Sequence, residues 1–398
     1  MRHPPVTAAQ ATFQPPATGS WWLRPAQLFD GTRLRAGAAL RIDAGRITEV
    51  TEAAAPPADS APAWQSECIA CPTFVDLQVN GGGGVLFNNE PTPEGLVAIA
   101  AAHRKGGTGA WLPTLLTAAP EVMTRAVEAV LTVYGQHGVA GMHIEGPHIS
   151  PDFRGAHALE YIRLLDEHTW ELLRRLRARD IPVILTLAPE RLPPGALAEL
   201  VALGVRVSIG HSGATEQEAR DAFAAGASLC THLFNGMPPL STKQVGLAGI
   251  ALDSPAWCGI IADGHHVADT MLRLAVRAKR GPEALFAVTD AMPTVHGPPA
   301  FELYGQTLHL EGGRLIDARG SLAGVHIDMI GTLRRLARDV KLPLETAFAM
   351  VTSAPARAAG LQDRHGFLVP NAPADLLLLD PRNLGIRHML LGGVTQPL

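Results

Sequence analysis

The segment "VRVSIGHSGATEQEARDAFAAGASLCTHL", residues 205–233, indicates how most of the chain folds. It opens with a short apolar run that ends at His211, continues through a helical stretch from Glu216, and closes with a second apolar run that reaches His232. A strand, a helix and another strand in this order are typical of a parallel sheet whose strands are connected by helices. The segment therefore predicts an α/β fold, and both of its strands end in a histidine.

Similar apolar runs recur along the chain and alternate with helical stretches. Eight strand candidates begin at Phe74, Gly109, Val139, Pro182, Val205, Ala227, Cys258 and Leu285. Eight strand–helix units over roughly 215 residues fit a (β/α)8 TIM-like barrel. An open doubly wound sheet is the alternative, although no Gly-x-Gly-x-x-Gly sequence follows an early strand, as dinucleotide-binding sheets of that kind usually have.

The two ends of the chain have shorter, strand-like patterns. Apolar and polar residues alternate in "LRIDAGRITEV", residues 40–50, on both sides of a turn at Asp43–Arg46, which predicts a hairpin. "ADLLLLD", residues 374–380, is another predicted strand. We therefore predict a small β-sandwich domain built from residues 20–71 and 355–398, and a barrel over residues 72–354.

The composition excludes several classes of partner. The 398 residues carry a formal net charge of -4, so there is no bulk positive charge to bind nucleic acid. No apolar stretch reaches the roughly 18 residues of a membrane span. Residues 1–19 lack the apolar core of a signal peptide, and we expect them to form a flexible N-terminal arm. The sequence thus predicts a cytoplasmic protein with neither a nucleic-acid nor a membrane partner.

The four cysteines do not indicate a disulfide scaffold in a chain of this length. Cys68 and Cys71 form one Cys-x-x-Cys sequence, but a zinc site would usually need a second pair, and none follows. Structural or incidental thiols are therefore favoured over a redox or zinc role.

Polar residues occur where the predicted barrel strands end. They are Gln78, Asn80, His143, Glu145, His211, His232, Asp263 and Asp290. The carboxyl ends of barrel strands converge on one mouth, where such enzymes carry out their chemistry. A single histidine at a strand end is more often a packing or capping residue. Several acidic and imidazole side chains at one mouth instead indicate a functional site.

Glu145, His211 and His232 could be three metal ligands. Two imidazoles and one carboxylate suit Zn²⁺ with a position left open for water, and Fe²⁺, Mn²⁺ or Co²⁺ accept the same set. A bound ion lowers the pKa of that water and polarises a carbonyl group. Asp290 is then the candidate general base, which takes a proton from the water and passes it to a leaving amine. The alternative for Asp290 is a cap on the following helix.

Gln78 and Asn80 indicate how many metal ions are held. Many metal-dependent barrel hydrolases have His-x-His at the end of the first strand and use it to hold a further ion. Amides are poor ligands for such metals. The sequence therefore predicts one divalent metal ion per subunit, with zinc as the expected metal.

Several longer motifs carry a family resemblance. They are "PTFVDLQVNGGGG", "HIEGPHISPDFRGAH", "GHSGAT", "THLFNGM", "ADGHHV", "VTDAM", "SLAG", "TSAPARAAGL" and "HGFLVPNAPADLLLLD". In this order the chain resembles the N-acetylglucosamine-6-phosphate deacetylases of the amidohydrolase superfamily. The resemblance implies hydrolysis of the acetamide of N-acetylglucosamine-6-phosphate to glucosamine-6-phosphate and acetate, in amino-sugar metabolism. It also implies a homodimer whose subunits share contacts to the phosphate.

The resemblance implies roles for individual residues. Glu145, His211 and His232 would bind the metal, Asp290 would be the acid/base residue, and His157 would polarise the scissile carbonyl. The implied substrate-binding residues are Ala156, His157, Asn235, Gly236, Lys243, His266, Leu322, Ala323 and Gly324. Among these, Asn235, Gly236 and His266 would contact the sugar or its phosphate, and residues 322–324 would line the acetyl side with backbone groups.

The chain departs from the family pattern at Lys243, where the family usually has arginine. Arginine binds phosphate with a planar fork, whereas lysine offers a point charge with looser geometry. The alternative is an exposed loop lysine with no ligand. Val325 and His326 follow the "SLAG" motif in place of small residues, and Val295 and His296 add bulk beside the strand of Asp290.

These departures leave three alternative functions open. The first is a deacetylase for a different or unphosphorylated N-acyl amino sugar. The second is a cyclic-amide hydrolase related to dihydroorotase, which would usually have His-x-His and a bridging lysine that "VILTLAPE" lacks. The third is a catalytically inactive barrel, against which the complete set of metal-ligand and acid/base candidates argues.

Overall fold

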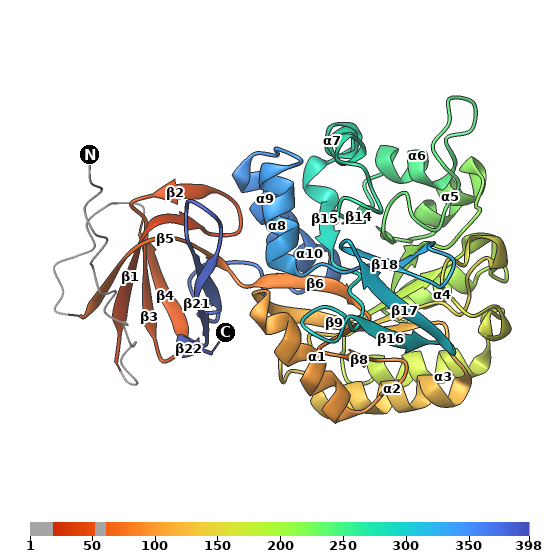
Figure 1. The fold of residues 1–398 in the computed structure, drawn as a ribbon, viewed down its shortest axis with the longest axis horizontal. Coiled ribbons are helices and arrows are strands. Elements are labelled where there is room, and N and C mark those ends of the chain that lie inside the picture. The colour runs from red at the N-terminus through yellow and green to blue at the C-terminus, as the bar shows by residue number, and fades with distance from the viewer. Residues whose placement is uncertain (1–18, 52–60, 398) are drawn as a thin grey trace.

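The computed structural model describes residues 19–51 and 61–397, so the predicted arm lies, except for Gly19, outside the described residues. The chain forms two lobes (Figure 1). A lobe of β-strands contains segments from both ends of the chain, and a larger lobe contains the barrel and its helices. Within the described ranges, no helix is long and apolar enough to cross a membrane.

The larger lobe is built on the predicted barrel of eight parallel strands. They are β6 (Phe74–Val79), β9 (Thr108–Leu116), β10 (Met142–Glu145), β11 (Val183–Leu187), β12 (Arg206–Ile209), β13 (Leu229–Cys230), β14 (Trp257–Ile261) and β15 (Leu285–Val288). Each pairs with the next in chain order. The ring closes where the Asp290 N–H donates to the Gln78 carbonyl at 2.9 Å and Val79 bridges Ala291. The barrel is confirmed, and every predicted barrel strand overlaps an observed one.

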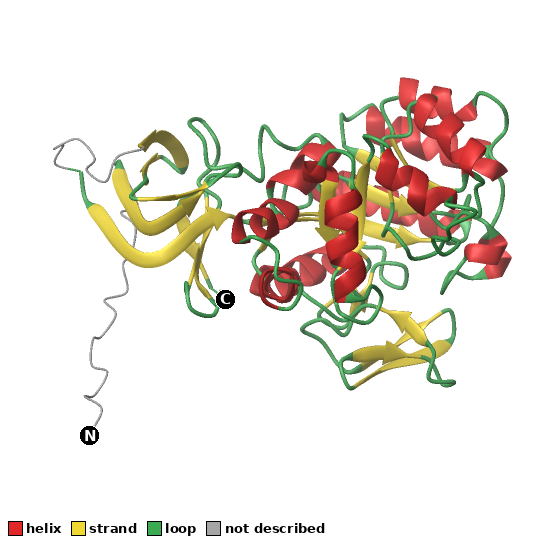
Figure 2. Ribbon diagram, turned by 90° about the horizontal axis from the view of Figure 1, so that it is seen from above, coloured by secondary structure: helices red, strands yellow, loops and turns green. Residues whose placement is uncertain are grey.

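Helices surround the barrel (Figures 1 and 2). They are α1 (Pro93–Lys105), α2 (Pro120–Val133), α3 (Glu167–Arg177), α4 (Ala196–Ala202), α5 (Glu216–Ala224), α6 (Gly246–Asp253), α7 (Asp269–Ala278), α8 (Met329–Arg338), α9 (Leu344–Val351) and α10 (Ser353–Ala359). Short 3-10 turns lie at Pro151–Phe153, Leu159–Tyr161, Pro189–Arg191 and Pro282–Ala284. Helix α5 shows why the opening segment folds as it does, because Thr215 and Glu218 form a reciprocal capping box at its start.

The smaller lobe joins the two ends of the chain in one sheet. Its strands are β1 (Trp21–Phe29), β2 (Leu34–Ala36), β3 (Ala39–Asp43), β4 (Arg46–Thr51), β5 (Ala63–Pro72), β20 (Leu376–Leu379), β21 (Ile386–Leu391) and β22 (Val394–Gln396). Strand β5 pairs with β1 on one side and with β20 on the other, and this pairing connects the ends. The predicted hairpin is present, with Asp43 opposite Arg46. The sheet curves around its own apolar core (Figure 2), which includes Trp21, Leu40 and Leu376.

A four-stranded antiparallel sheet follows β15 and was not anticipated from the sequence. Its strands are β16 (Ala300–Leu303), β17 (Gln306–Glu311), β18 (Arg314–Ile316) and β19 (Leu322–Gly324). This insert sheet lies beside the barrel (Figures 1 and 2). Its Leu303 and Leu308 pack with Leu116, Met292 and Leu86, the last of which lies in the short hairpin of β7 (Gly81–Gly82) and β8 (Val85–Leu86). The insert sheet therefore covers part of the barrel mouth.

Candidate metal centre and active site

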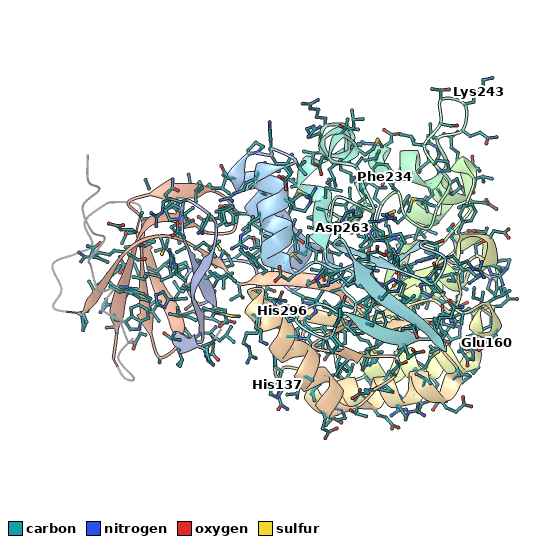
Figure 3. All side chains as sticks on the ribbon, in the orientation of Figure 1. His137, Glu160, Phe234, Lys243, Asp263 and His296 are labelled. Carbon is teal, nitrogen blue, oxygen red and sulfur yellow. The ribbon has the colours of Figure 1, made fainter. Side chains whose placement is uncertain are left out.

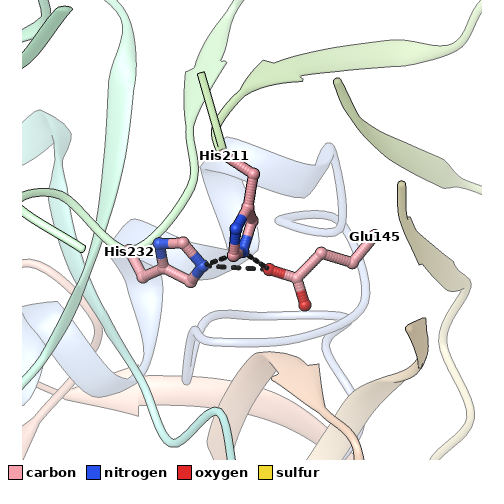
Figure 4. A group of neighbouring side chains, drawn as sticks. All are labelled: Glu145, His211 and His232. Carbon is pink, nitrogen blue, oxygen red and sulfur yellow. Dashed lines mark hydrogen bonds and ion pairs between the residues drawn. The ribbon is translucent and has the colours of Figure 1, made fainter. Parts of the chain in front are cut away.

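Three ligand-type side chains converge at the barrel mouth (Figure 4). Glu145 ends β10, and His211 and His232 follow β12 and β13. The Glu145 Oε1 atom lies 3.1 Å from His211 Nε2 and 2.9 Å from His232 Nε2, and the two Nε2 atoms are 3.0 Å apart. All three side chains are buried. The structure therefore brings together the three predicted ligands.

The donor set fits a divalent metal ion. The His211 Nδ1–H donates to the Phe153 carbonyl at 2.8 Å, so the lone pair of a neutral ring lies on Nε2, which faces the other two ligands. Metal-binding histidines are commonly oriented in this way by a carbonyl group. The Nδ1 atom of His232 is buried without a partner in the described part of the chain. Three protein ligands would leave a position open for water, as in catalytic zinc sites.

Electrostatics at the cluster favour a charged glutamate. Burial opposes ionisation of Glu145, but hydrogen bonds from His211 and His232 outweigh it and hold the pKa of the carboxyl well below its usual value. Burial lowers the pKa of His232, but Glu145 more than compensates and the net shift is upward. A divalent cation would take the place of the proton that these groups share.

Asp290 lies at the same mouth, held by two amide side chains at the carboxyl end of the first barrel strand. Its Oδ1 accepts hydrogen bonds from Gln78 Nε2 at 3.0 Å and from Asn80 Nδ2 at 2.7 Å, and Gln78 Nε2 also lies 3.0 Å from Glu145 Oε1. Burial, followed by repulsion from Glu145, raises the pKa of Asp290 to about 6. The two amides therefore contact the carboxylates, and Asp290 can exchange a proton near neutral pH.

His157 lies next to the cluster, with its ring centroid 4.5 Å from that of His211. Burial, followed by the nearby His211, lowers the pKa of His157 to about 3. The ring is therefore neutral at physiological pH. A neutral imidazole has one N–H group, which can donate a hydrogen bond to a substrate.

A cavity of about 910 Å³ opens onto these groups. Its lining includes Glu145, His211, His232 and Asp290 together with the predicted residues Ala156, His157, Asn235, Gly236, His266, Leu322, Ala323 and Gly324. Gly236 packs directly against the metal-ligand candidate His211, because a Cβ there would lie 2.9 Å from Nδ1 of that ring. His266 is oriented by Asp263, whose Oδ2 lies 2.7 Å from His266 Nδ1.

Lys243 does not line this cavity. It is exposed on a loop between β13 and α6 that extends away from the barrel (Figure 3). The other predicted departures also lie outside the lining. Val295 and Val325 are buried, and His296 is 2.9 Å from Asp328. Cys68 and Cys71 lie on β5 in the smaller lobe as free thiols.

Several lining residues were missed by the sequence analysis. Arg154 lies in the quoted "DFRGAH" segment, and Tyr304 and Arg319 come from the insert sheet and its turns. The sequence did carry a signal for this sheet, because Tyr304–Gly305 and Gly312–Gly313 are hairpin-type turns between alternating residues. The insert sheet thus forms one wall of the cavity, which could not be predicted from the residues at the ends of the barrel strands.

Comparison with known proteins agrees with this geometry. Residues 69–395 match the Amidohydrolase family. The chain is 42% identical to the N-acetylgalactosamine-6-phosphate deacetylase of Shewanella sp. (strain ANA-3), over 71% of this chain and 72% of the relative. It is 35% identical to the N-acetylglucosamine-6-phosphate deacetylase of Haemophilus influenzae, over 77% of this chain and 81% of the relative.

Solved structures show the same likeness. The N-acetylglucosamine-6-phosphate deacetylase from Pasteurella multocida superimposes with a TM-score of 0.88 at 30% identity, covering 96% of this chain and all of the other. A mutant of the Mycobacterium smegmatis enzyme in complex with N-acetyl-D-glucosamine-6-phosphate gives a TM-score of 0.86 at 30% identity, covering 94% of this chain and 99% of the other. The chain therefore belongs to the amidohydrolase family, and the resemblance to its amino-sugar-phosphate deacetylases is confirmed.

Proposed function

We propose that this enzyme hydrolyses the acetamide of N-acetylglucosamine-6-phosphate, giving glucosamine-6-phosphate and acetate. One observation carries the proposal. The cluster of Glu145, His211 and His232 and the carboxyl group of Asp290 line one cavity, where an amide carbonyl can contact both. The names of the related deacetylases support the choice of substrate class.

We assign the proton transfers of the reaction to Asp290. One divalent ion per subunit, with zinc as the expected metal, would be held by Glu145, His211 and His232 and would supply an acidified water and polarisation of the carbonyl group. Asp290 takes a proton from the attacking water as its oxygen bonds to the acetyl carbon. It then gives that proton to the sugar nitrogen as the C–N bond breaks, which leaves acetate and a free amine.

His157 and the cavity wall position the substrate. The neutral ring of His157 donates a hydrogen bond to the carbonyl oxygen, on which negative charge develops during attack. Ala156 lies beside that ring, and the backbone of Leu322, Ala323 and Gly324 borders the acetyl group. These groups make the site complementary to the transition state of amide hydrolysis.

The sugar phosphate is assigned to Asn235, Gly236 and His266. Lys243 lies outside the cavity of its own subunit, so a contact to phosphate requires that it reach the site of a second subunit. We therefore propose a homodimer in which Lys243 takes this role in the partner's cavity. We also propose that the enzyme acts in the cytoplasm, where its phosphorylated substrate would be found.

A second candidate substrate is N-acetylgalactosamine-6-phosphate. It is favoured by the 42% identity to the Shewanella enzyme, which exceeds the identity to the Haemophilus one. The two sugars differ only in the configuration of one hydroxyl group, so both leave the amide chemistry unchanged. The enzyme would distinguish the two sugars through polar contacts on the sugar side of the cavity.

Acetate release from both sugar phosphates and from unphosphorylated N-acetylglucosamine tests the proposal. Purified protein of known metal content would be used. We expect strong preference for a phosphorylated sugar, with the ratio of kcat/KM values for the two epimers identifying the substrate. Equal rates with and without phosphate would reject the phosphate assignment, and no acetate from any of the three would reject the proposed function.

A further inference from the structure

Thr117 lies directly after β9, buried beside the ring of His157. Its backbone nitrogen is 3.2 Å from His157 Nδ1, and its hydroxyl oxygen is 2.8 Å from the same atom. A backbone N–H group can only donate a hydrogen bond, whereas a hydroxyl can donate or accept. Nδ1 must therefore be the acceptor of the backbone N–H, which means that it carries a lone pair and no proton.

The position of the ring proton follows from this contact. A neutral imidazole with an unprotonated Nδ1 carries its proton on Nε2. His157 lines the cavity, and its Nε2 has no hydrogen-bond partner among residues 19–51 and 61–397. The N–H group is therefore free to meet a substrate oxygen.

Two further contacts fix Thr117 in place. Its hydroxyl also lies 3.4 Å from the Glu145 carbonyl, which is a longer contact than the one of 2.8 Å to His157 Nδ1. On its other side, the Thr117 carbonyl accepts a hydrogen bond from the Tyr304 hydroxyl at 2.6 Å. Thr117 is thus held between the insert sheet and the site.

We propose that Thr117 is a positioning residue for the reaction. Its backbone N–H keeps His157 in the tautomer whose Nε2–H donates to the scissile carbonyl oxygen, and its hydroxyl holds the ring in place. The opposite tautomer would present a lone pair to the same oxygen and would repel its developing charge. The inference rests on the proposed function, since it gives His157 a substrate carbonyl to polarise.

The tautomer can be measured without any turnover. In zinc-loaded protein labelled with ¹⁵N-histidine, long-range proton–nitrogen correlation spectra distinguish protonated from unprotonated ring nitrogens. The signal of His157 would be identified by its absence in His157→Gln. We expect an unprotonated Nδ1 and a protonated Nε2. A protonated Nδ1 would overturn the proposal, whatever the activity of the enzyme.

Turnover by matched variants tests the consequence. Thr117→Val removes the hydroxyl and keeps the side-chain shape, Thr117→Ser keeps the hydroxyl, and Thr124→Val removes another threonine–histidine contact, to His168 on α3. The substrates are the acetyl sugar phosphate and its trifluoroacetyl analogue, whose activated carbonyl depends less on a hydrogen-bond donor.

We expect Thr117→Val to lower kcat for the acetyl substrate by about tenfold with little change in KM, because the donor loses its precise position. The loss should be smaller for the trifluoroacetyl analogue, and Thr117→Ser should retain most of kcat. An equal loss on both substrates, or no loss, would overturn the proposal. An inactive wild-type enzyme would reject the proposed function and leave the tautomer measurement to decide the inference.

Discussion

At the scale of single residues, the backbone at the site is unusual. His211, His232 and Asp290 all have positive φ angles, of 48°, 25° and 51°. Residues other than glycine seldom adopt this region, and each such residue costs roughly 1–3 kcal/mol of stability, a cost that functional sites often carry. Each of the three lies two residues after the end of a barrel strand, where the turn directs the side chain into the mouth.

The raised pKa of Asp290 predicts an acidic limit to activity. The carboxylate must be unprotonated to accept a proton from water, and its pKa is about 6. That value belongs to the metal-free site, and a divalent cation would lower it. We therefore expect kcat/KM of the metal-loaded enzyme to fall about tenfold per pH unit once the pH drops below the pKa of Asp290, at or below about 6, because the fraction of ionised Asp290 falls in proportion. The measurement is a pH–rate profile at saturating metal. A profile that is flat down to pH 4 would argue against Asp290 as the base.

Residue chemistry was the most predictable part of the site. Glu145, His211 and His232 were found from their positions at strand ends, because parallel barrel strands all open onto one mouth. The positive φ angles could not be predicted, since tertiary contacts impose them. Thr117 was also missed, because one threonine after an apolar strand carries no signal until its neighbour His157 is placed.

At the scale of elements, the barrel strands could be predicted because they are buried on both faces and read as unbroken apolar runs. Strand β13 contains only Leu229–Cys230, but the apolar run around it still predicted a strand, because it follows a helical stretch in the regular strand–helix alternation. The insert sheet was missed because it interrupts the expected strand–helix alternation between β15 and α8. Its strands are short and partly exposed, which weakens their pattern.

The Tyr304 hydroxyl is predicted to fasten the insert sheet to the barrel. Tyr304→Phe removes its hydrogen bond to the Thr117 carbonyl and keeps the ring. We expect faster amide hydrogen exchange in residues 300–324, because a tether with a free energy of about 1 kcal/mol is lost. Tyr134→Phe is the control, since its hydroxyl contacts Arg364 on the exposed surface. Unchanged exchange in the insert sheet would show that other contacts hold it.

At the scale of the whole molecule, the sheet of the smaller lobe ties the two ends of the chain together through β5. The sequence indicated both ends as strand-forming, and their pairing is observed, while the exact domain boundaries stay a prediction. The proposed homodimer adds a second level of organisation, because one subunit would complete the site of the other. Lys243 is the residue for which this matters, because it does not line the cavity of its own subunit and would contact phosphate in the partner's cavity.

The lowered pKa values of buried histidines lead to a prediction of how the stability of the whole chain depends on pH. Burial lowers the pKa of His103 and of His148 to about 4. The unfolded chain binds protons at these groups near pH 6.5, whereas the folded chain does not until about pH 4. The free energy of unfolding should therefore fall as the pH drops from 6.5 toward 4, by about 1.4 kcal/mol per pH unit for each histidine.

Urea unfolding of the metal-free protein between pH 7.5 and 4.5 measures the slope of the free energy of unfolding against pH. His103→Gln should reduce the slope, while His309→Gln, a change at an exposed position, should leave it as in the wild type. A slope that His103→Gln leaves unchanged would contradict the expected neutral state of that buried ring.

Single-turnover acetate release by the wild type and by Asp290→Asn, with metal content measured in the same samples, tests the role of Asp290 most directly. We expect the variant to retain about one metal ion per subunit, because Glu145, His211 and His232 are intact. We expect its rate to fall roughly a hundred- to ten-thousand-fold, because the acid/base group is lost. Acetate release near the wild-type rate from a metal-loaded variant would contradict this role.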